Sequence, residues 1–173
     1  NGATQQVPTG IDNTGKALVW FKTISAGNNV LLDTVRQPQP PENLRSNATD
    51  AQGNGVDIQS FDNNGVTILA GGGNNANWIN ANGVNQVAWN FRAAPGFFDV
   101  VTYDGTKTTN TVSHSLGSVP GMIICKSIDN SGVWATYHQS LGSTDVLFLN
   151  LDQQAASGTA AWDSTEPTSS TFT

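Results

Sequence analysis

Cysteine, charge and long apolar runs are scarce in this sequence, and each scarcity excludes a class of protein. The single cysteine, Cys125, cannot form an internal disulfide, so the fold does not depend on an oxidising compartment. Seven basic residues against thirteen acidic ones, for a net charge of −6, argue against a nucleic-acid-binding surface. No apolar run approaches the ~20 residues that a membrane-spanning helix needs. We therefore expect neither nucleic acid nor a membrane as a partner.

Helical periodicity is also missing, and strand signals take its place. No adequate window repeats apolar residues at i, i+3, i+4 and i+7, and the one short helical candidate, 153–161, is interrupted by Gly158. Gly, Asn, Thr and Ser suit tight turns between short strands. We predict an all-β fold, a β-sandwich of jelly-roll or lectin-like type. β-Branched and aromatic residues predict its strands at 16–25, 30–35, 56–61, 66–69, 86–91, 97–103, 122–128, 133–138 and 146–149.

One strand-and-turn pattern occurs twice in the chain. After one gap in the lead-in, residues 18–24 align with residues 122–128, with Leu18 opposite Met122. Because the match continues well beyond this first block, it favours an internal duplication. Residues 1–94 are then the first copy and residues 95–173 the second, packed as one domain. Further along, Val30, Leu44, Asn47 and Ile68 fall opposite Val133, Leu147, Asn150 and Phe172.

The second copy lacks the end of the pattern. The first copy closes with a Gly/Asn-rich loop at 71–83 and the strand at 86–91, whereas the second stops at Thr173. A strand missing from a sheet leaves a row of unpaired backbone groups along its neighbour. We expect that the natural protein continues past Thr173 or that a neighbouring chain supplies the strand, and both alternatives favour a larger assembly.

Three turns share an Asp-Asn opening and a closing glycine, at 11–15, 61–65 and 128–132. Asn and Gly tolerate left-handed backbone, so the pattern is typical of hairpin turns. Calcium is the alternative, because Asp and Asn oxygens are hard ligands. The alternating acids and distal Glu of an EF-type loop are absent, however, so we expect no metal.

No convincing catalytic set stands out. Glycoside hydrolysis needs two facing carboxylates, but the two glutamates, Glu42 and Glu166, each lie beside proline, and Asp99 in a predicted strand has no identifiable partner. Cys125 could pair with His114 or His138, yet it lies in the apolar run 122–125 and is expected to be a small core residue. We expect no enzymatic activity and no cofactor.

Two of the five tryptophans point to a sugar site. Trp20, Trp89 and Trp134 lie in apolar strands and are expected in the core. An aromatic ring beside amide side chains can stack on a pyranose and hydrogen-bond to its hydroxyls. Trp78 lies among asparagines and Trp162 follows small residues, so they differ from the other three. The alternative is that Trp78 plugs the end of the sandwich. The predicted glycan-binding residues are Trp78, Asn77, Asn80 and Trp162.

The sequence resembles a repeat common in virion proteins of marine bacteriophages, especially cyanophages. The resemblance spans nearly the whole chain and rests on motifs of this sequence: LVWFK and LLDTVR within 18–36, AWNFRAAPGFFDVVTY at 88–103, HSLGSVPGMIICK at 114–126, WATYHQSLG at 134–142 and LNLDQQA at 149–155.

That resemblance implies a virion structural module, in a tail fibre or decorating a capsid. Such a module mediates adhesion to the host surface or stabilises the particle. Its expected partners are other virion proteins, copies of itself and a host-surface glycan, and its expected location is the virion. The alternatives are a carbohydrate-binding lectin-like domain and, less favoured, a glycan depolymerase.

Overall fold

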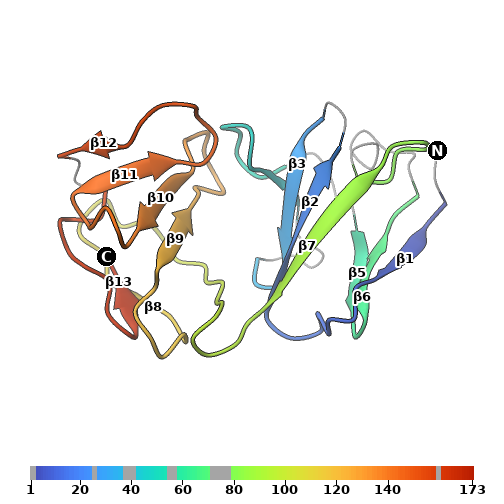
Figure 1. Ribbon diagram of the computed structural model, residues 1–173, viewed down its shortest axis with the longest axis horizontal. Coiled ribbons are helices and arrows are strands. Elements are labelled where there is room, and N and C mark those ends of the chain that lie inside the picture. Colours follow the sequence, from blue (N-terminus) through green and yellow to red (C-terminus); the bar gives the residue numbers. More distant parts are fainter. Residues whose placement is uncertain (1–2, 25–26, 37–41, 54–57, 71–78, 159–160) are drawn as a thin grey trace.

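The fold is described from a computed structural model for residues 3–24, 27–36, 42–53, 58–70, 79–158 and 161–173 (Figure 1). The regular elements in these ranges are all β-strands and every pairing is antiparallel, which confirms the predicted all-β fold. The strands are β1 (Gln5–Pro8), β2 (Ala17–Thr23), β3 (Asn29–Asp33), β4 (Leu44–Arg45), β5 (Ile58–Asp62), β6 (Gly65–Ile68), β7 (Gln86–Arg92), β8 (Val112–Ser113), β9 (Met122–Cys125), β10 (Ala135–His138), β11 (Asp145–Phe148), β12 (Ala156–Ser157) and β13 (Thr171–Phe172).

The first half of the chain is a β-sandwich. A four-stranded sheet in the order β4-β3-β2-β7 faces a three-stranded sheet in the order β1-β6-β5. Side chains alternate across a strand, so Val19 and Phe21 of β2 point into the sandwich while Leu18 and Trp20 point to the opposite face. The buried core between the sheets consists of Val19, Phe21, Val30, Leu32, Ile58, Val66, Ile68 and Ile79.

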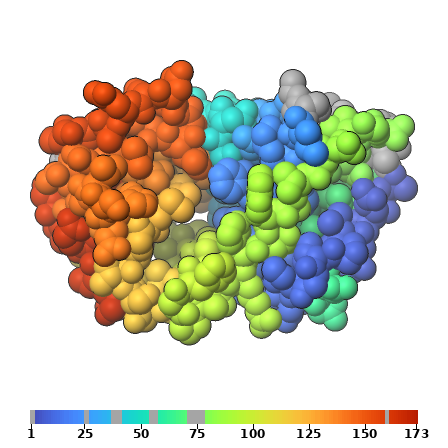
Figure 2. All heavy atoms as spheres, viewed as in Figure 1, coloured from blue at the N-terminus to red at the C-terminus, as the bar shows by residue number. Residues whose placement is uncertain are grey.

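The second half has its own sheet and core. Its four strands follow the order β12-β11-β10-β9, and β8 pairs separately with β13. Tyr137, Val146 and Trp162 are buried together, with Ile123 and Phe148 among the half-buried residues around them. The two halves lie side by side along the long axis (Figure 1), and their boundary is hollowed near its middle on the face shown in Figure 2.

Trp134 joins the halves. Its ring, 3% exposed, packs with Leu31 and Leu44 of the first sheet, on the face opposite the sandwich core. Its Nε1 donates hydrogen bonds to the carbonyls of Arg45 (3.1 Å) and Ala48 (3.0 Å). Backbone bonds from Gln52 N to Ile128 O (2.8 Å) and from Gly132 N to Thr49 O (2.7 Å) cross the same boundary.

The strand pairings repeat between the halves. β2 sets Trp20 opposite Leu31 of β3, and β9 sets Ile124 opposite Thr136 of β10. With Leu18 set opposite Met122, as the alignment predicts, these registers set Leu31 opposite Thr136. Likewise Leu147 takes the place of Leu44. The same superposition sets Val30 opposite Ala135 and not opposite Val133, because the β9–β10 connection is one residue longer than the β2–β3 connection.

Two predicted elements differ from the structure. Residues 97–103 form no strand beyond the isolated bridge between Ala94 and Phe98, because their side chains are anchored individually: Phe97 and Phe98 pack on Phe91, and Asp99 bonds to Lys16. The helical turn considered at 153–161 is absent from its described part, which contains β12 paired with β11. The predicted strand at 56–61 is confirmed from Ile58, and its first two residues lie outside the described ranges.

The three Asp-Asn turns adopt different geometries. In the β5–β6 hairpin Gly65 has a φ of +135°, and a Cβ there would lie 2.1 Å from the carbonyl oxygen of Val7, so glycine is required. Gly15 and Gly132 do not adopt positive φ, contrary to the prediction. The N–H of Gly132 instead donates a hydrogen bond to the carbonyl of Thr49 across the boundary between the halves.

Replacing Trp134 by Phe tests the junction. The variant keeps an aromatic ring but leaves two carbonyls without their donor, so we expect it to lower the free energy of unfolding by about 1–3 kcal/mol. Chemical denaturation measures the loss. Trp89→Phe is the control, since Trp89 is 45% exposed and should change stability by less than about 0.5 kcal/mol. Equal effects of the two substitutions would contradict the role of Trp134.

Acid should weaken the contact between Lys16 and Asp99, whose Nζ and Oδ1 lie 2.6 Å apart. Burial alone raises the pKa of Asp99, but hydrogen bonds from Lys16 and from the N–H groups of Ser115 and Val100 bring that pKa below its usual value. A lowered folded-state pKa stabilises the fold above the unfolded-state pKa, and this stabilisation disappears as the pH falls through the folded-state value.

We therefore expect Asp99→Asn to reduce stability near neutral pH and to lose less stability than the wild type on acidification. Denaturant midpoints at pH about 7 and about 3 measure both effects. The same acid-dependent loss in both proteins would show that Asp99 is not the responsible group.

Candidate functional site

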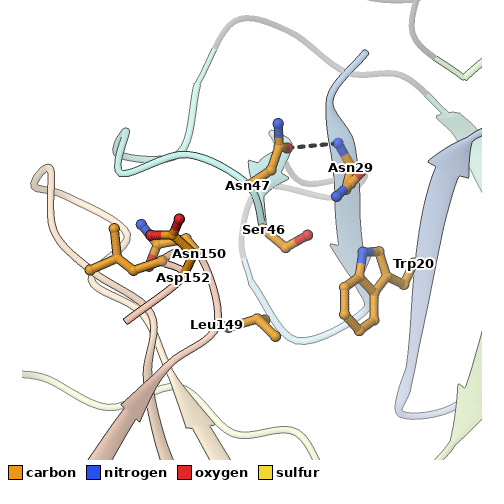
Figure 3. A pocket seen from close by; sticks show the side chains of 8 residues that line it. Trp20, Asn29, Ser46, Asn47, Leu149, Asn150 and Asp152 are labelled. Atoms are coloured by element: carbon orange, nitrogen blue, oxygen red, sulfur yellow. Dashed lines mark hydrogen bonds between the residues drawn. The ribbon is translucent and has the colours of Figure 1, made fainter. Parts of the chain in front are cut away.

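An open cleft of about 400 Å³ lies at the boundary between the halves (Figure 3). The first half contributes one wall from β2, the start of β3 and the residues after β4. The second half contributes the other from the segment that follows β11. The lining residues are Trp20, Asn29, Ser46, Asn47, Leu149, Asn150, Leu151 and Asp152.

The strand pattern positions the first wall. Alternation in β2 turns Trp20 away from the sandwich core and toward the boundary. Ser46 and Asn47 directly follow the short strand β4, and they are fixed to the start of β3. The N–H of Ser46 donates to the carbonyl of Asn29 (3.0 Å), and Asn47 Oδ1 accepts from the N–H of Asn29 (2.8 Å).

The second wall repeats this corner with other residues. The N–H of Leu149 donates to the carbonyl of Trp134 (3.0 Å), and Asn150 Oδ1 accepts from the N–H of Trp134 (2.9 Å). Asn47 and Asn150 are the pair that the internal alignment predicts to be equivalent. One asparagine corner from each half therefore lines the cleft, and both corners are held by the same two bonds.

Three polar atoms of the first wall have no hydrogen-bond partner among the described residues: Trp20 Nε1, Asn29 Oδ1 and Ser46 Oγ. Ser46 is 3% exposed, and in Figure 3 its hydroxyl, the Trp20 ring and the Asn29 side chain point toward one another. A buried polar group without a partner costs about 1–3 kcal/mol. Each atom has less than 1 Å² of accessible surface, so a small side-chain adjustment must accompany any bond to a ligand.

The chemistry of the cleft is polar and nearly uncharged. The three unpartnered atoms are a donor, an acceptor and a hydroxyl that can do both. Asp152 is the ionisable residue of the lining, which contains no Lys, Arg or His. Such a set favours a neutral ligand rich in hydroxyl groups over a phosphate, sulfate or carboxylate.

The two predicted glycan residues that the structure describes, Asn80 and Trp162, do not line this cleft. Asn80 is 6% exposed, and its amide donates to the carbonyls of Ala3 (3.0 Å) and Leu69 (2.6 Å), so it braces the sandwich. Trp162 is 4% exposed and packs edge-to-face on Tyr137 in the second core, which leaves no free ring face for a sugar. Trp78 and Asn77 lie outside the described residues.

The other tryptophans also differ in part from their prediction. Trp134 is buried as expected, but Trp89 is 45% exposed and Trp20 lines the cleft. Residues 18–21 form an apolar run that alternates between two faces, so Val19 and Phe21 enter the sandwich core while Trp20 faces the boundary. The match between Asn47 and Asn150 was the sequence signal that could have found the cleft.

The carboxylates that stood out in the sequence have structural partners. Asp99 pairs with Lys16, while Glu166 accepts hydrogen bonds from the Tyr137 hydroxyl (2.7 Å) and the N–H of Ser143 (2.8 Å). The bond from Tyr137, followed by those from Ser143, lowers the pKa of Glu166. A glycosidase acid needs the opposite shift.

Cys125 and the histidines do not form a catalytic pair. Burial raises the pKa of the Cys125 thiol, which keeps it protonated at neutral pH. His138 lies opposite Met122, at the far end of β9 from Cys125, and His114 stacks on Phe172.

Within the described ranges no group of three His, Cys, Asp or Glu residues is placed to hold a metal ion. The same described ranges contain no helix long and apolar enough to cross a membrane.

Fold and site together define an all-β protein with a polar cleft at the boundary of two halves. The chain belongs to the family described as "Domain of unknown function (DUF7483)", whose model matches residues 1–173. No curated protein and no solved structure matches the chain.

The unpartnered hydroxyl of Ser46 leads to a stability prediction. We expect Ser46→Ala to leave the free energy of unfolding unchanged or to raise it by up to about 1 kcal/mol, because the variant no longer buries an unbonded hydroxyl. Ser60→Ala is the matched control: the Ser60 hydroxyl donates a hydrogen bond to Asp62 Oδ1 (2.7 Å), so this variant should be destabilised. Thermal denaturation measures both. A clear loss of stability in Ser46→Ala would mean that the hydroxyl has a partner.

Proposed function

We propose that this chain is a non-enzymatic module of a bacteriophage virion that adheres to the host surface by binding a neutral glycan in the cleft. The virion assignment rests on the resemblance of the motifs between residues 18 and 155. The observation that carries the binding proposal is the set of unpartnered polar atoms beside an indole and two asparagines.

A sugar matches this set better than other ligand classes. Each hydroxyl of a pyranose donates and accepts hydrogen bonds, so neighbouring hydroxyls can satisfy Trp20 Nε1, Asn29 Oδ1 and Ser46 Oγ once small side-chain adjustments bring these buried atoms to the cleft surface. Asn150 Nδ2 and the second N–H of Asn47 Nδ2, whose first donates to Asn28 Oδ1 (3.2 Å), add further donors. Leu149 and Leu151 offer apolar surface. A volume of about 400 Å³ lies within the range of small-ligand sites and fits one or two sugar rings.

The arrangement of the carboxylates favours sugar binding without hydrolysis. Asp99 and Glu166 are held by hydrogen bonds that lower their pKa values, and Asp152 is the one carboxylate of the cleft lining. Retaining and inverting glycosidases both use two carboxylates across the scissile bond. The depolymerase alternative therefore has less support than adhesion.

Particle stabilisation is the second candidate function, and it rests on a different observation. Large apolar side chains are exposed on the second half, among them Phe97 (68%), Met122 (58%) and Val119 (49%). Exposed apolar surface of this kind is typical of protein–protein contact. It favours contacts with other virion proteins, which adhesion through the cleft does not exclude.

A glycan array on the purified chain, followed by calorimetry on the ligands found, tests the cleft. We expect binding to neutral glycans, and we expect Trp20→Phe to weaken it about threefold to tenfold, because the variant loses one hydrogen bond but keeps the ring. Ser46→Ala should weaken binding without loss of stability. Trp89→Phe is the matched control, since Trp89 contacts Trp20 but does not line the cleft.

The absence of binding to any glycan would overturn the adhesion proposal and leave particle stabilisation as the better one. Binding that responds equally to Trp20→Phe and Trp89→Phe would place the sugar elsewhere on the chain.

A further inference from the structure

The outer edge of β9 is open. Among the described strands β9 pairs with β10 alone and ends the order β12-β11-β10-β9 (Figure 1). Its counterpart β2 pairs on both sides, with β3 and with β7. The alternate N–H and C=O groups of β9 that point away from β10 therefore have no described strand beside them, whereas those of β2 are paired along seven residues.

The side chains of β9 are more exposed than those of β2, as expected for a strand that lacks a neighbour on one side. Ile123 and Cys125 are half-buried against the second core, as Val19 and Phe21 are buried in the first. On the opposite face Met122 is 58% and Ile124 36% exposed.

Their counterparts Leu18 and Trp20 are half-buried. Trp20 meets Trp89 of β7 edge-to-face, with ring centroids 5.9 Å apart, and Leu18 lies opposite Phe91. Both also pack in the cluster around Trp134. The open edge therefore leaves apolar surface uncovered as well as backbone groups.

The edge also lacks the features that usually block strand addition. Charged residues, prolines and bulges protect the exposed edges of natural sheets. Residues 122–125 contain no charged residue and no proline, and β9 pairs with β10 without a register shift. Pro120 and Lys126 lie just outside and limit the accessible edge to these four residues.

From these observations we propose that β9 accepts one extended segment of a different protein, antiparallel to β9 and with the side-chain pattern of β7, which in this chain is already paired with β2. Transferring the β2–β7 register places its residues: the counterpart of Phe91 lies opposite Met122, and that of Trp89 opposite Ile124. The counterparts of Asn90 and Ala88 lie opposite Ile123 and Cys125.

The bound segment therefore carries large apolar residues at two alternate positions and small or polar ones between them. It binds by β-strand addition: the backbone bonds give affinity, and the side chains facing Met122 and Ile124 give specificity. This proposal does not depend on glycan binding in the cleft.

The test uses the full chain and a synthetic peptide of residues 84–95, which contains β7 with its flanks. Hydrogen exchange of the amides in Met122–Cys125 is measured with and without the peptide. We expect slower exchange in β9 and little change in β2. Two further peptides carry backbone N-methyl groups on one set of alternate residues or on the other. Strand addition uses one edge of the peptide, so one N-methylated peptide should bind and the other should not.

Substitutions in the protein supply the second arm. Met122→Lys and Ile124→Lys change exposed side chains, so the variants should fold, and the charge at the edge should abolish peptide binding. Ile24→Lys, at a residue that is 72% exposed beyond the end of β2, is the matched control and should bind normally. Binding in the cleft, where it occurs, should be unaffected by all three.

Unchanged exchange in β9 at millimolar peptide would overturn the proposal, and so would equal binding of both N-methylated peptides. Self-association of the wild-type chain without peptide, lost in Ile124→Lys, would also overturn it, because a second copy of the chain would then cover the edge.

Discussion

The burial of Trp134 against the first sheet is the interaction on which the rest of the molecule depends. Without it the outer face of the first sheet, which carries Leu31, Leu44 and Trp20, would be exposed to water. Because both faces of that sheet are covered, β2 and β3 read as nearly continuous apolar runs rather than as alternating ones. The same contact places the segment after β11 opposite the end of β4 and so creates the cleft.

The fold class was predictable because the residues that favour strands and turns follow one another directly in the sequence. β-Branched and aromatic runs, together with Gly and Asn between them, gave the positions of β2, β3, β6, β7, β9, β10 and β11 to within a few residues. Short strands such as β1, β8 and β13 escaped prediction, since two to four residues carry too little pattern. The false strand at 97–103 has the right composition, but its aromatic rings and Asp99 are bound to partners distant in sequence, and those partners decide its conformation.

The candidate site was largely unpredictable for a related reason. Composition identified an indole beside amides as the chemistry to look for, and the cleft does contain that chemistry. The residues that line it are not the predicted ones, because neighbours in the sequence do not determine which side chains are exposed. Trp162 follows small residues yet is buried on Tyr137, and Trp20 lies in an apolar run yet reaches the boundary. Which face of a strand meets a second layer depends on packing between distant segments, and one sequence does not contain that information.

In the repeated asparagine corner, the hydrogen bonds that hold the cleft together do not involve the side chains of the neighbouring lining residues. In each half the frame consists of one asparagine oxygen and one backbone bond to the start of a strand. The neighbouring positions, Ser46 in one half and Leu149 in the other, are already different. Mutation can therefore diversify each rim independently while the scaffold stays intact. A surface of this design can follow a changing target over evolutionary time, as antibody loops do on a constant framework.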